Sequence, residues 1–168
     1  LTRLLDAQKF QMLCTSTRRA FFTQAILSLE FVEDWSIETA CTHAAGGKRL
    51  MRFNPDFIIS LTEREVAGVL AHEALHWLLE HVGERGRRLF EENQQRANAA
   101  ADLEVNQMLD ESGYELPGES HQYPALFPGC KALKKYKLPP WESFEKYWTL
   151  LDDKQQQNQD GDQFGPGC

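Results

Sequence analysis

The segment of residues 66–79 is apolar except for His72, Glu73 and His76. A helix that is apolar almost all round is buried, and burying two imidazoles and a carboxylate is costly unless a partner satisfies them. Histidines four positions apart lie about 40° apart around a helix and roughly 6 Å apart along it. Both can therefore bind one zinc ion, with Glu73 beside it as a base for the attacking water. The alternative is a buried histidine pair bonded to backbone carbonyls, and the apolar surroundings favour zinc.

Signals at both ends of this segment predict one long helix over about residues 63–81. Thr62 and Glu65 have the spacing of a capping box, in which a hydroxyl and a carboxylate three residues on satisfy the first backbone N–H groups. Gly83 suits the end of the helix. Asn54-Pro55, just upstream, predicts a separate turn or the start of a short helix.

Composition is that of an ordinary water-soluble domain, with 42% hydrophobic and 26% charged residues among 168. The formal net charge of −7 argues against a nucleic-acid-binding surface. No apolar run reaches the roughly 18 residues of a membrane span, and no signal-peptide pattern opens the chain. We therefore expect neither a nucleic-acid partner nor a membrane.

The four cysteines, Cys14, Cys41, Cys130 and Cys168, are scattered and form no C-x-x-C pair. They do not resemble a disulfide framework or a structural zinc site. Free thiols in a reducing compartment are the expectation, which predicts a cytoplasmic location. A regulatory thiolate from Cys130 or Cys168 that blocks the zinc is the alternative.

The remaining elements predict an α+β fold in one domain. Apolar spacing predicts helices over residues 1–14 and 20–32, and the turn at Gly46-Gly47 predicts a hairpin within residues 37–53. A charged connection or exposed helix follows at residues 84–95, and then a helix over residues 97–111 that ends at Gly113. A short helix over residues 141–151 precedes a polar disordered tail, residues 152–168. The domain is thus residues 1–151, with N-terminal helices in 1–34 and the catalytic core in 35–151.

A catalytic zinc usually has three protein ligands, and the helix over residues 97–111 offers Asp102 as the third. At 100° per residue, Asp102 lies only about 20° from Leu109, at the edge of an apolar arc. A carboxylate at the edge of a core-facing surface favours a cation partner, although an exposed helix acid is the alternative. Asn98 and Asn106, one turn to either side, are candidates to orient the ligands, and the alternative is that they cap the helix or bond to backbone groups. The arc consists of Ala101, Val105, Met108 and Leu109.

Five successive motifs resemble the putative metallopeptidase domain found N-terminal to von Willebrand factor A domains in bacterial and phage proteins. The resemblance covers about residues 21–151. The helix of residues 143–151 is similar to the helix that closes that domain. The motifs are Thr39-Ala-Cys-Thr42, Arg52-Phe-Asn54-Pro55, Leu70-Ala-His72-Glu73-Ala-Leu-His76, Asn98-Ala-Ala-Ala-Asp102-Leu-Glu-Val-Asn106 and Gly113-Tyr-Glu-Leu-Pro117.

The resemblance implies a zincin-like α+β fold with His72, His76 and Asp102 as zinc ligands and Glu73 as general base. Members often continue through a polar linker into a von Willebrand factor A domain, and are often encoded near MoxR-type AAA+ ATPases. The metzincin pattern does not fit, because it needs Gly and His at positions occupied by Leu and Val. A thermolysin-like arrangement would use a glutamate of the later helix, which leaves Glu104 as the reserve ligand.

These observations predict a zinc-dependent endopeptidase acting on a peptide or protein substrate. A strand near residues 48–53 is expected to hold the substrate by strand addition. His121, Tyr123 and Tyr114 are candidates to stabilise the oxyanion. The alternative is a zinc-stabilised interaction module that couples an AAA+ ATPase to a partner and cleaves nothing.

Overall fold

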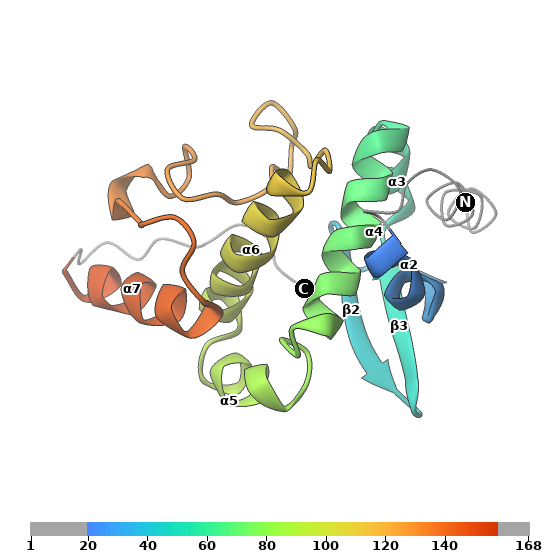
Figure 1. The fold of residues 1–168 in the computed structure, drawn as a ribbon, viewed down its shortest axis with the longest axis horizontal. Helices are drawn as coiled ribbons and strands as arrows, with labels where there is room; N and C mark the ends of the chain where they lie inside the picture. Colours follow the sequence, from blue (N-terminus) through green and yellow to red (C-terminus); the bar gives the residue numbers. More distant parts are fainter. Residues whose placement is uncertain (1–19, 158–168) are drawn as a thin grey trace.

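A computed structural model describes the backbone of residues 20–157 and the side chains of residues 24–152. Helices and a small sheet together confirm the predicted α+β class (Figure 1). The strands are β1 (Leu29–Glu33), β2 (Ala40–Ala45) and β3 (Lys48–Phe53). The helices are α2 (Ala20–Leu27), α3 (Pro55–Ser60), α4 (Glu63–Leu78), α5 (Glu84–Glu92), α6 (Gln94–Glu111), α7 (Phe144–Gln157) and the 3-10 helix η1 (Lys134–Tyr136).

The three-stranded sheet has the order β1-β3-β2. β2 and β3 form the predicted antiparallel hairpin, and the turn residues Gly46 and Gly47 both have positive φ, which glycine adopts without strain. β1 pairs with β3 in parallel. β3 therefore has partners on both sides, so the prediction that residues 48–53 hold a substrate by strand addition is wrong.

The predicted helix over residues 20–32 is wrong in its second half. α2 ends at Leu27, and Leu29–Glu33 is β1. Leu29 is buried, and Phe31 packs edge-to-face on Phe53 of β3, with ring centroids 6.4 Å apart. Pairing with β3 and this cross-strand contact override a local pattern that also suits a helix. The helix predicted over residues 1–14 lies outside the described residues, and the division of the domain at residue 34 stays a prediction.

α4 begins where the capping box predicts. The Thr62 hydroxyl accepts from the Glu65 backbone N–H, and the Glu65 carboxylate accepts from the Thr62 N–H. The helix ends earlier than predicted, at Leu78, because Glu80 has a φ of 58° and turns the chain. Gly83 is the N-cap of α5 rather than the end of α4. Of the two alternatives for the charged segment, the helix is the one observed.

α6 lies between two hydrophobic clusters. One cluster joins the sheet to α2, α3 and α4, and the other joins α6 to α5 and α7. Figure 1 shows α6 between α4 on one side and α7 on the other. Three members of the predicted apolar arc, Val105, Met108 and Leu109, pack in the first cluster, whereas the fourth, Ala101, belongs to the second.

The last helix is longer than predicted, because α7 runs from Phe144 to Gln157. The Asp152 carboxylate, expected to begin a disordered tail, forms an ion pair with Arg96 of α6. Residues 158–168 of that tail lie outside the described residues. Within the described part of the chain, no helix is long and apolar enough to cross a bilayer.

Gly68 tests the close packing behind α4. A Cβ at Gly68 would overlap the backbone carbonyl oxygen of Glu115, which belongs to the loop after α6. We expect Gly68→Ala to lower the free energy of unfolding by about 1–3 kcal/mol, because one side must shift to relieve the overlap. Gly118→Ala is the control. A Cβ added there meets no atom within 4 Å beyond the adjacent residues, so the free energy of unfolding should change by no more than about 0.5 kcal/mol. Urea denaturation of the two variants measures both, and equal effects would contradict the packing.

Candidate metal centre

His72 and His76 lie one turn apart on α4 and present their Nε2 atoms to each other at 2.9 Å. The helix spacing places both rings on one face. Their side chains are largely buried, with relative exposures of 17% and 10%. Two ring nitrogens at this distance can share one hydrogen between an N–H and a lone pair, or can direct two lone pairs at one cation.

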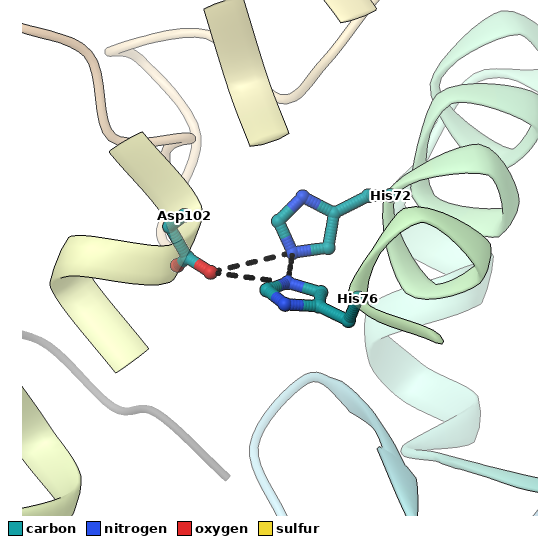
Figure 2. A group of neighbouring side chains, drawn as sticks. All are labelled: His72, His76 and Asp102. Carbon is teal, nitrogen blue, oxygen red and sulfur yellow. Dashed lines mark hydrogen bonds and ion pairs between the residues drawn. The ribbon is translucent and has the colours of Figure 1, made fainter. Parts of the chain in front are cut away.

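Asp102 of α6 provides a carboxylate opposite this pair. Its Oδ1 lies 3.4 Å from the Nε2 atoms of both His72 and His76, and Figure 2 shows it pointing from one helix towards the two rings on the other. One ligand atom from each residue lies within 4.8 Å of the other two. The sequence predicted His72, His76 and Asp102 as the ligands, and the fold brings these three residues together.

The donor set fits a zinc ion. Zinc prefers tetrahedral coordination by histidine nitrogen, cysteine sulfur and carboxylate oxygen, and catalytic sites keep one of the four positions open. Two imidazole nitrogens and one carboxylate oxygen supply three donors here. The reserve ligand Glu104 lies outside this group and contacts His81 and Arg85 instead.

Glu73 is buried beside the three donors and lines the same cavity. Burial raises the pKa of its carboxyl group to about 7, although the charge of His72 and a hydrogen bond with Thr42 of β2 oppose the rise. A carboxyl group with a pKa near neutrality is suited to accept and return a proton at physiological pH. Sequence reasoning found Glu73 from the motif but missed the role of Thr42, which the packing of β2 against α4 brings to it.

The metal-free protein holds the cluster together through charge. Burial lowers the pKa of His72, but the hydrogen bond and charge of Asp102 outweigh it and raise the pKa to about 9. Burial and the nearby His72 charge lower the pKa of His76 to about 4. Burial raises the pKa of Asp102, but the two histidines that face its carboxylate hold it well below the usual range. One protonated and one neutral histidine thus share an ionised carboxylate.

Polar contacts also hold the far side of each histidine ring. Nδ1 of His72 lies 2.8 Å from Oδ1 of Asn106, whose Nδ2 donates to the carbonyl of Leu126. This is the orienting role predicted for Asn106. Asn98 lines the same cavity.

The other histidine contacts a residue that the sequence analysis missed. Nδ1 of His76 lies 3.1 Å from Nδ1 of His81, and Nε2 of His81 lies 2.6 Å from the Glu104 carboxylate. Burial raises the pKa of Glu104, but its bonds with His81 and Arg85 outweigh this and hold the pKa below its usual value. The only sequence signal for this role is that His81 follows the histidine pair by five residues.

A cavity of about 820 Å³ opens over these groups. Its floor contains His72, Glu73 and Asp102, and residues 39–44, which include most of β2, form one wall. Residues 116–117 and 123–125 of the loop after α6 also line it, as do residues of α5. The space is of the size that holds a small ligand or a short stretch of peptide.

The three oxyanion candidates are placed differently. Tyr123 lines the cavity. Tyr114 is buried in the first hydrophobic cluster, and His121 bonds to Ser60 and packs against Phe57 instead of lining the cavity. Cys130 is partly buried against the second cluster, away from the cavity, and Cys168 lies outside the described residues.

Comparison with known proteins places the chain in a family. The family model described as "Putative metallopeptidase domain" matches residues 6–164, and this range contains all three donors and Glu73. No match was found among curated proteins, and none among solved structures. Because the match spans nearly the whole chain and includes the three candidate metal ligands, the chain belongs to the putative metallopeptidase domain family.

Proposed function

We propose that this chain is a zinc-dependent metallopeptidase that hydrolyses peptide bonds, with a zincin-like active site. The observation that supports this most directly is the convergence of His72, His76 and Asp102 beside Glu73 at the floor of one cavity. His72 and His76 would hold the ion through Nε2 and Asp102 through a carboxylate oxygen. A zinc ion bound there would act as a Lewis acid that polarises the scissile carbonyl and makes water more acidic.

Glu73 is the residue that would move the proton. Its carboxylate would take a proton from the attacking water, whose oxygen forms the bond to the carbonyl carbon. It would then return that proton to the leaving amine as the carbon–nitrogen bond breaks. Water is thereby added across the peptide bond. Thr42, which bonds to the Glu73 carboxylate, would hold it in position.

The substrate would lie along β2. This strand is at the edge of the sheet, and its residues Ala40–Ala44 line the cavity beside the metal centre. An extended peptide would add to the outer edge of β2 through backbone hydrogen bonds, which recognise any sequence. Tyr123 is the one of the three oxyanion candidates that the cavity includes, so it would be the hydroxyl donor to the developing oxyanion.

A non-catalytic zinc module that works with a MoxR-type AAA+ ATPase is the alternative. Such a module needs metal ligands but has no use for a buried, protonatable carboxylate beside them. The presence of Glu73 at 5% exposure therefore favours catalysis, because burying an acid without a function is costly.

Glu73→Gln tests the base assignment. We expect this variant to bind zinc with the affinity of the parent and to hydrolyse a peptide library or casein at least about 100-fold more slowly, because the amide cannot accept the proton. Glu63→Gln, on the exposed first turn of the same helix, is the matched control and should keep full activity. Hydrolysis by Glu73→Gln at the parental rate would refute the role of Glu73.

Asp102→Ala tests the third ligand. We expect zinc affinity to fall by more than the roughly 10- to 100-fold that loss of an outer partner of a ligand costs. The gain in melting temperature on adding zinc should shrink accordingly, because that gain follows the affinity of the folded state. Asp110→Ala, at an exposed position of the same helix, should keep the parental affinity. A competition titration with a chromophoric chelator measures both, and equal affinities would exclude Asp102 as a ligand.

A further inference from the structure

His81 is a buried polar residue that is not one of the three candidate metal ligands. Its side chain is fully buried, with 0% exposure. One ring nitrogen, Nδ1, lies 3.1 Å from Nδ1 of His76, and the other, Nε2, lies 2.6 Å from the Glu104 carboxylate. A continuous row of hydrogen-bonding groups therefore runs from Glu104 through His81 to the back of His76.

The direction of these hydrogen bonds follows from the chemistry of the groups. An ionised carboxylate only accepts, so Nε2 of His81 carries the hydrogen that it donates to Glu104. In a neutral imidazole the other nitrogen is then an acceptor. With His81 neutral, its Nδ1 therefore accepts from Nδ1–H of His76. His76 is left with a bare lone pair on Nε2, the atom that faces His72 and Asp102.

The chain positions His81 by an unusual turn. After α4 ends, Glu80 adopts a φ of 58°, and the backbone N–H of His81 donates to the carbonyl of His76 at 2.9 Å. Gly86 of α5 then packs against the His81 carbonyl so closely that a Cβ would overlap it. The turn and this packing together hold the His81 ring beside His76.

Glu104 is held in turn from the second hydrophobic cluster. Both nitrogens of the Arg85 guanidinium fork bond to its carboxylate, at 3.2 Å each. Arg85 also bonds to Glu145 of α7 through two contacts of 2.7 and 3.0 Å. Phe144 packs against the His81 ring, with centroids 4.8 Å apart. Helices α5, α6 and α7 all contribute to holding the pair of His81 and Glu104.

We propose that His81, held by Glu104, is a positioning residue for the metal centre. It fixes His76 as the tautomer with hydrogen on Nδ1 and thereby presents the Nε2 lone pair to the ion. This inference rests on the proposed function in so far as the ion is zinc and His76 is its ligand. Outer partners of this kind set the tautomer and ring orientation of histidine ligands, and their loss typically weakens metal binding 10- to 100-fold.

A matched pair of substitutions separates this role from simple packing. In His81→Asn the side-chain amide lies about where Nδ1 of histidine lies, so its oxygen can still accept from Nδ1–H of His76. In His81→Gln the amide lies about where Nε2 lies, near Glu104, and the acceptor for His76 is lost. Both variants replace a buried ring by a smaller polar chain, so both should lower the melting temperature of the metal-free protein to a similar extent.

The zinc affinities of the two variants should differ. Chelator competition should give His81→Asn an affinity within a few-fold of the parent and His81→Gln an affinity about 10- to 100-fold weaker. Lys146→Gln is the surface control: it removes an exposed charge from α7 and should leave zinc affinity unchanged. Equal zinc affinities for His81→Asn and His81→Gln would overturn the proposal.

A second measurement needs no metal. Two-bond 15N–1H correlation spectra of the metal-free protein, which has five histidines, report which ring nitrogen of each carries hydrogen. We expect His76 in the Nδ1–H form in the parent and in His81→Asn, and loss of that single form in His81→Gln. His76 with hydrogen on Nε2 in the parent would overturn the proposal that His81 fixes the His76 tautomer. A parent chain that binds no zinc would refute the proposed function. The spectra would still show whether His81 fixes the tautomer of His76.

Discussion

Helices α4 and α6 meet across a surface where two histidines and a carboxylate lie among apolar side chains. Removing such groups from water is costly unless each finds a partner. Here His72 and His76 share the Asp102 carboxylate, with Oδ1 3.4 Å from each ring. The polar attraction between the helices and the geometry of the three candidate donors therefore come from the same residues, beside the apolar packing of the first cluster. Zinc would strengthen a contact that the metal-free chain already makes.

Contacts with the rest of the fold hold α4 and α6 in place. Ala71 and Ala74 of α4 are buried small residues in the first cluster. The buried alanines of α6, at positions 97 and 99–101, lie in the second cluster and let α5 and α7 approach α6 closely. Gly68 lets the loop after α6 pass directly over α4. The sheet packs on α4 through β2, which lines the cavity together with α6, and brings Thr42 to Glu73. Each of these contacts restricts how the donors can move relative to one another.

Each histidine ligand candidate is supported from a different part of the molecule. His72 is held by Asn106, whose amide is oriented by the Leu126 carbonyl in the loop after α6. His76 is held by His81, behind which lie Glu104 and the second hydrophobic cluster. Both supports use the Nδ1 atom and leave Nε2 for the ion. The proposed active site thus depends on both hydrophobic clusters, although only α4 and α6 provide the donors.

The sequence by itself determined the features that depend on neighbouring residues. Spacing of four on a helix brings His72 and His76 to one face, the capping box starts α4 at Glu63, and paired glycines close the β2–β3 hairpin. The side of α6 that Asp102 occupies was also predicted correctly, although Ala101, one of the four residues of the apolar arc used to argue it, packs in the second cluster. The family was recognised from the same local motifs.

Only the tertiary structure decided the features that depend on distant pairing. Leu29–Glu33 is a strand because β3 is available beside it, and β2 rather than β3 is the edge strand for the same reason. Glu104 was expected as a reserve ligand, but the fold places it against His81, which is 23 positions away in sequence. No local pattern distinguishes these outcomes, because the energy of a hydrogen bond or a buried contact depends on which group the rest of the chain brings alongside.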